Sequence, residues 1–78
     1  MTKDILKTIG QRVRFLRKSK NFSQEELAEK IEMSRNALGS IERGETNVPL
    51  LTLNKIYKAL GKDLSTLFKK RKSRIRRS

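Results

Sequence analysis

Residues 35–43, RNALGSIER, combine polar side chains that can read base edges with apolar residues at helical spacing. If Leu38 and Ile41 are buried, Arg35 and Asn36 lie in the first turn on the opposite side of a short helix. An arginine guanidinium can form two parallel hydrogen bonds with O6 and N7 of guanine, and an asparagine amide can do the same with N6 and N7 of adenine. This pattern favours contact with base pairs in a major groove.

The segment before this helix predicts a second short helix and a tight turn. Ser23 and Glu26 have the spacing of a capping box, and apolar residues follow at helical spacing. Ser34 can cap the next helix after a three-residue break, and Gly44 can end it in the left-handed conformation. A helix, a sharp turn and a second short helix make up a helix-turn-helix DNA reader.

The rest of the chain predicts further helices and no strand, five helices in all. Asn21 can end the first helix in the left-handed conformation, Gly61 can end the fourth, and Asp63 can cap the last. The apolar stripes expected in the first and fourth helices are Leu6, Ile9, Val13 and Leu16, and Leu50, Leu53, Ile56 and Leu60. The expected core consists of Val13, Leu16, Leu27, Ala28, Ile31, Leu38, Ile41, Leu53, Ile56 and Leu60.

Composition independently favours a polyanionic partner. The 78 residues suffice for one small domain, and the formal net charge is +12. The sequence has no cysteine and no histidine, the commonest residues in thiolate metal sites, zinc sites and acid–base catalysis, so we expect no metal, cofactor or enzymatic activity. No apolar run reaches membrane-spanning length and no signal peptide opens the chain, so we expect a cytoplasmic protein without a membrane partner.

The positive charge is concentrated at the carboxyl end. Seven of the twenty basic side chains lie in residues 69–78, which hold no acidic side chain. We expect residues 1–68 to form the folded domain and residues 69–78 to be a basic tail, disordered in isolation. This tail is either a solvated terminus or an arm that lies along DNA phosphates.

The Ser-Gln-Glu-Glu-Leu-Ala run at 23–28 and Ile-Glu-Arg-Gly at 41–44 resemble the lambda-repressor/Cro type of helix-turn-helix, also called the XRE family. Residues 9–17, 51–61 and 63–68 resemble its first, fourth and fifth helices. The resemblance implies an all-α, compact five-helix lambda-repressor-like domain that binds double-stranded DNA. It also implies a transcriptional regulator that recognises a palindromic operator as a homodimer, and restriction-modification controller proteins are one subgroup of this size.

The resemblance also implies roles for individual residues. It assigns base contacts to Arg35, Asn36 and Ser40. It assigns phosphate contacts to Gln24, Ser34, Arg43, Thr46 and Asn47. It implies a structural salt bridge between Arg17 and Glu42, a dimer interface at Leu64, Leu67 and Phe68, and a contact with the RNA polymerase sigma subunit at Glu25 and Glu29.

Two positions depart from the family pattern. Glu32 stands where the turn before the recognition helix usually has glycine, and Pro49 stands where the fourth helix usually has a serine cap.

The regulator could be autoregulatory, as a repressor and also as an activator. An antitoxin-type module that binds a toxin and its own operator is the alternative. A nucleic-acid enzyme is the third class, and the dispersed acidic residues disfavour it.

Overall fold

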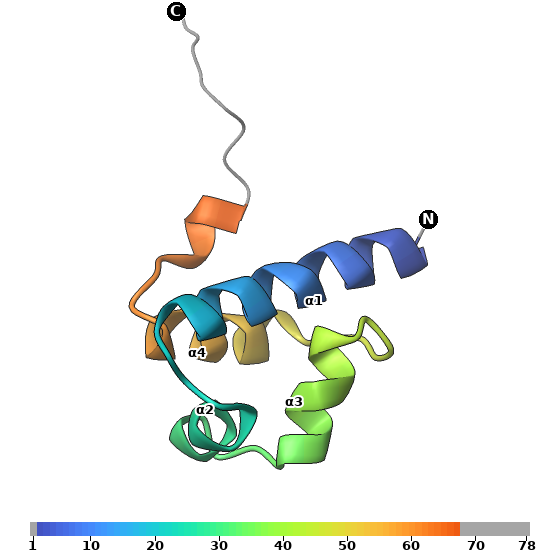
Figure 1. Ribbon diagram of the computed structural model, residues 1–78. Helices are drawn as coiled ribbons and strands as arrows, with labels where there is room; N and C mark the ends of the chain where they lie inside the picture. The colour runs from blue at the N-terminus through green and yellow to red at the C-terminus, as the bar shows by residue number, and fades with distance from the viewer. Residues whose placement is uncertain (1, 68–78) are drawn as a thin grey trace, which may run out of the picture.

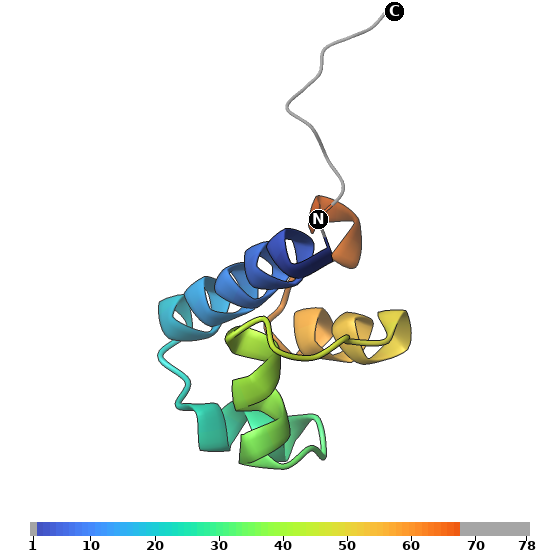
Figure 2. The ribbon, with the colours of Figure 1, turned by 90° about the vertical axis from the view of Figure 1, so that its right-hand side faces the viewer.

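The computed structural model describes residues 2–67, which form four α-helices and one short 3-10 helix (Figure 1). These elements are α1 (Thr2–Ser19), α2 (Gln24–Lys30), α3 (Arg35–Glu42), α4 (Leu50–Ala59) and η1 (Leu64–Leu67). Residues 2–67 contain no strand, so the expected all-α class is confirmed for them. Figures 1 and 2 show α2 and α3 on one side of α1, and Figure 1 shows α4 behind α1.

The prediction of five α-helices is wrong at the fifth, which is the four-residue 3-10 helix η1. The Thr66 N–H donates to the Asp63 carbonyl, three residues back, at 3.0 Å. The Asp63 carboxylate accepts from the Ser65 N–H at 2.9 Å, as expected of a cap. The bond from Thr66 to Asp63 spans three residues, which is the register of a 3-10 helix and not of an α-helix. Phe68 and the expected basic tail, 69–78, lie outside the described residues.

Both predicted caps of the helix-turn-helix are present. The Ser23 hydroxyl accepts from the Glu26 N–H at 3.0 Å, and the Glu26 carboxylate accepts from the Ser23 N–H at 2.8 Å. The Ser34 hydroxyl accepts from the Ala37 N–H at 3.0 Å. These bonds fix where α2 and α3 begin, and a side-chain cap of this kind contributes about 1 kcal/mol.

The turn between α2 and α3 contains a residue in the left-handed backbone conformation, although that residue, Glu32, is not glycine. Glu32 has φ of 58°, a conformation that costs a non-glycine residue about 1–2 kcal/mol. The next N–H, that of Met33, donates to the Ala28 carbonyl at 2.9 Å and closes the turn. At the other departure from the family pattern, Pro49 precedes α4 and no side chain caps that helix.

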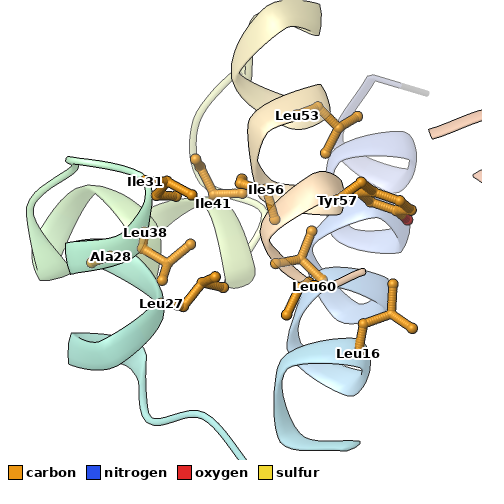
Figure 3. Packing of buried hydrophobic residues seen from close by; sticks show 11 residues of the cluster. Leu16, Leu27, Ala28, Ile31, Leu38, Ile41, Leu53, Ile56, Tyr57 and Leu60 are labelled. Carbon is orange, nitrogen blue, oxygen red and sulfur yellow. The ribbon is translucent and has the colours of Figure 1, made fainter. Parts of the chain in front are cut away.

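All ten predicted core residues are buried, and they form one cluster between the helices (Figure 3). The cluster has one member that the sequence prediction missed, Tyr57, which is 1% exposed. The expected burial of Leu50 is wrong, because this side chain is 61% exposed. Leu50 is the first residue of α4, and Figure 2 shows that this end of α4 projects beyond the other helices. Within residues 2–67, no neighbouring element covers it there.

Gly10 lets α1 and α3 approach at backbone distance. A Cβ atom on Gly10 would lie 2.3 Å from the Ile41 carbonyl oxygen and 2.5 Å from that of Glu42. Any other residue would push the carboxyl end of α3 away from α1, since real Cβ contacts are never so short. The position of the predicted recognition helix therefore depends on a glycine on another helix.

Candidate nucleic-acid interface

The polar face of α3 is open to solvent, and its apolar face is buried. Leu38 and Ile41 are 0% and 5% exposed, whereas Arg35 and Asn36 are exposed and Ser40 is half-buried. Figure 2 shows α3 at the surface of the molecule, with no helix in front of it. The predicted base-contacting residues therefore share an accessible helix, and Arg35 and Asn36 lie in its first turn.

A buried ion pair joins α3 to α1, at the two residues that the resemblance implies. Arg17 Nε donates to Glu42 Oε2 at 2.7 Å, and a terminal nitrogen of the same guanidinium donates to Oε1 at 3.1 Å. Arg17 also donates to the Phe22 carbonyl at 2.7 Å. Arg17 is 7% and Glu42 6% exposed. The pair is bidentate and shielded from water, so it fixes the orientation of α3 relative to α1.

The same carboxylate holds Gln24, at the start of α2. Gln24 Nε2 donates to Glu42 Oε1 at 3.0 Å. An amide nitrogen carries two hydrogens, so one N–H of Gln24 engages Glu42 and the second is available for another acceptor. Arg17, Glu42 and Gln24 thus connect the first three helices and set the direction of the Gln24 amide.

Basic side chains from α1 and α3 surround this amide. A cleft of about 560 Å³ lies where these two helices meet the start of α2. It is lined by Arg14, Arg17, Lys18, Ser23, Gln24, Glu25, Arg35, Glu42 and Arg43. Arg14 and Lys18 are two members of the site that were not predicted from the sequence. Their spacing of four in the sequence could have identified them, because it places both side chains on the side of α1 that bears Arg17.

The other predicted phosphate contacts lie around the ends of α3. Thr46 and Asn47 are exposed in the segment after α3. The Ser34 hydroxyl oxygen accepts the capping hydrogen bond at the start of α3, so its O–H remains able to donate to a phosphate. Arg43 lines the cleft, and its Nε lies 3.0 Å from Glu45 Oε2.

The remaining predicted site residues lie apart from one another. Glu25 and Glu29 are both exposed, but Glu25 lines the basic cleft, whereas Glu29 lines a separate hollow beside Phe22. Leu64 is half-buried against the core. The side chain of Leu67 and the whole of Phe68 lie outside the described part of the chain.

Between residues 2 and 67, no three carboxylates, histidines or cysteines gather to hold a metal ion, and no helix is long and apolar enough to span a membrane.

Known proteins are similar to this chain both in sequence and in fold. The Helix-turn-helix family model matches residues 13–67. Control protein C.BamHI from Bacillus amyloliquefaciens is 48% identical over 62 residues, covering 78% of this chain and 76% of the relative. Control protein C.MunI from Mycoplasma sp is 44% identical over 66 residues, covering 83% and 89%.

A solved structure extends the likeness to three dimensions. The crystal structure of the restriction-modification controller protein C.AhdI from Aeromonas hydrophila has a TM-score of 0.75 and 39% sequence identity. The match covers 78% of this chain and 88% of that one. The family model spans both helices of the predicted DNA reader together with the core that holds them. This chain belongs to the helix-turn-helix family of DNA-binding transcriptional regulators.

Proposed function

We propose that this protein is a transcriptional regulator of the restriction-modification controller type, which binds its operator with α3 in the major groove. The observation that carries this proposal is the continuity between the exposed first turn of α3 and the basic cleft at the start of α2. Base-reading and phosphate-binding side chains then act from one rigid surface. The names of the similar proteins support the subgroup, and an immunity repressor protein among the relatives supports control of transcription.

Within this function, some residues of α2, α3 and the following loop contact bases and others contact phosphates. Arg35, Asn36 and Ser40 hydrogen-bond with base edges. The free N–H of Gln24 donates to a backbone phosphate, and the positive end of the α2 peptide dipoles favours the same anion. Ser34, Arg43, Thr46 and Asn47 bind phosphates around the ends of α3.

A single short helix reads few base pairs, so we propose that the protein acts as a homodimer. Two copies related by a twofold axis would read half-sites about 34 Å apart. Leu64, Leu67 and Phe68 are the proposed interface. Dimerisation would make operator occupancy depend on the concentration of the protein in the cytoplasm.

Selection from a pool of random double-stranded DNA tests this function directly. Bound fragments should yield a palindromic consensus with two half-sites one helical turn apart. The Asn36→Ala variant should select a consensus that is relaxed at one position in each half. Fragments with no common sequence would reduce the protein to a nonspecific DNA binder and contradict the proposal.

The antitoxin-type alternative is not favoured, because the similar proteins include a control protein and an immunity repressor protein. It predicts a stable complex with a second protein that competes with operator binding, which co-purification from the native host would reveal. We propose no enzymatic activity. Cleavage of operator DNA in the presence of Mg²⁺ or Mn²⁺ would contradict this.

A further inference from the structure

The first half of α1 carries two lysines outside residues 13–67, which match the helix-turn-helix family. Lys3 and Lys7 are both exposed, and their spacing of four places them on one side of α1. Figure 1 shows this half of α1 running alongside the loop that follows α3. The lysines are therefore near the predicted recognition helix, although they lie far from it in the sequence.

The backbone fixes the distance between α1 and this loop. Gly44 has φ of 74°, and a Cβ atom there would lie 2.7 Å from the Cα atom of Lys7. The loop and the helix are thus in direct backbone contact, as are α1 and α3 at Gly10. The base of the Lys7 side chain consequently has a defined position relative to α3, and only the outer part of the side chain is free to adapt.

A second hollow lies at this contact, with a volume of about 480 Å³. It is lined by Lys3, Leu6, Lys7, Arg43, Gly44 and Glu45. Three of these side chains are cationic and one is anionic, so the hollow has an excess of positive charge. Arg43 lines this hollow and also the basic cleft beside Gln24, so the two form one continuous cationic surface.

Glu45 holds Arg43 at the boundary between the two hollows. Arg43 Nε lies 3.0 Å from Glu45 Oε2, and both side chains are more than half exposed. Such an exposed pair adds little to the free energy of unfolding. It engages one of the five guanidinium N–H groups, and the others remain available for a phosphate oxygen.

We propose that Lys3 and Lys7, together with Arg43, bind a backbone phosphate next to the base pairs read by α3. The proposal rests on the proposed function and extends its contact surface along α1. Ammonium groups bind phosphate as point charges without regard to base identity. Along α1, Lys7 and Arg14 are about 10 Å apart at 1.5 Å per residue, so the two hollows can engage different phosphates of one strand.

The test compares two doubly substituted proteins of equal charge. Lys3→Gln with Lys7→Gln removes the proposed contacts and retains good helix formers. Lys55→Gln with Lys58→Gln is the control, since both residues are exposed on α4. Dissociation constants are measured over a series of salt concentrations, for the selected operator and for a scrambled duplex. Circular dichroism establishes that each variant is folded.

We expect the α1 variant to bind both duplexes more weakly and with a shallower salt dependence. The slope of log K against log salt should decrease by about 1, because a phosphate contact contributes about 0.9. The preference for operator over scrambled DNA should remain. Ethylation of one phosphate outside the base-contacted pairs should weaken DNA binding by the parent protein and leave DNA binding by this variant unchanged.

The two proposals fail in different ways. If the parent protein prefers its operator but the α1 and α4 variants have the same slope, the lysine contact is wrong and the regulator function stands. If the parent shows no sequence preference, the regulator function fails. The slopes measured on any duplex still decide whether Lys3 and Lys7 contact phosphate.

Discussion

At the scale of single residues, Arg35 is the side chain whose loss should most directly change base preference. Arg35→Ala should weaken operator binding by about 1–3 kcal/mol, because it removes a bidentate contact with guanine. Binding to a scrambled duplex should barely change. Parallel titrations of the two duplexes measure this difference, and an equal loss on both would show that Arg35 contacts a phosphate instead.

Tyr57 offers a stability test that is independent of DNA. Its hydroxyl is buried and has no hydrogen-bond partner within residues 2–67. An unsatisfied buried hydroxyl costs about 1–3 kcal/mol, so Tyr57→Phe should raise the free energy of unfolding by about 1 kcal/mol in urea denaturation. A lower free energy of unfolding would indicate a bonding partner for the hydroxyl beyond these residues.

The same residue predicts a dependence on alkaline pH. Burial raises the pKa of the Tyr57 phenol, and the nearby Arg12 guanidinium partly offsets this rise. The unfolded chain therefore loses the phenolic proton first, at pH about 10. The folded protein should lose stability as the pH rises above that value, because ionisation favours the unfolded state. This contribution should be absent from Tyr57→Phe.

The limits of sequence reasoning are visible in single residues. Ser23, Glu26 and Ser34 could be identified as caps because capping depends on local spacing. Arg35 and Asn36 could be identified as exposed because two buried neighbours fix the face of α3. The requirement for glycine at position 10 depends on a helix about thirty residues away, and nothing near it in the sequence indicates that contact.

At the scale of helices, the Arg17–Glu42 pair should control the orientation of α3. Glu42→Ala leaves the Arg17 guanidinium buried without its carboxylate, so it should lower the free energy of unfolding by about 3–5 kcal/mol. Arg17→Met with Glu42→Leu removes both charges and should recover most of that loss. Urea denaturation of the single and double variants measures both effects.

The double variant separates stability from the orientation of Gln24. It removes the carboxylate that accepts from Gln24 Nε2, so the amide is no longer directed. We expect weaker DNA binding by a protein that remains stable. Full affinity in the stable double variant would show that Gln24 needs no support from Glu42.

The ends of helices could be predicted where they depend on caps and turns close in the sequence. The predictions were wrong where packing against other helices decides the outcome. Asn21, Glu32 and Gly44 all adopt positive φ at predicted breaks. Burial of Leu50 was wrong, because periodicity gives the face of a helix but not how far its neighbours extend. The last element is a 3-10 helix because its hydrogen bonding joins residues three apart, from Thr66 to Asp63.

At the scale of the whole molecule, dimerisation should depend on one apolar surface. Leu67→Asp should weaken both self-association and operator binding, because it places a charge in an apolar contact. Leu51→Asp is the matched variant, as Leu51 is 80% exposed on α4. Light scattering at several concentrations measures the association. If Leu51→Asp disrupts the dimer and Leu67→Asp does not, the interface includes the start of α4 instead of η1.

We also propose that the DNA-bound protein contacts the sigma subunit of RNA polymerase through Glu25 and Glu29, and so activates transcription. The two carboxylates differ in position: Glu25 lines the basic cleft, whereas Glu29 lies in a separate hollow. Charge reversal at Glu25 would strengthen DNA binding directly, by adding a cation to the cleft. Glu29 is therefore the sharper probe.

Glu29→Lys should abolish activation of a promoter reporter while leaving operator occupancy unchanged, because sigma would meet a lysine where it requires a carboxylate. Glu32→Lys is the control, since Glu32 is also exposed and undergoes the same charge change. Occupancy is held at saturation and measured by footprinting in the same cells. Activation that survives in Glu29→Lys, or never occurs with the parent protein, would leave α2 without a polymerase contact. The protein would then control transcription only by occupying its operator.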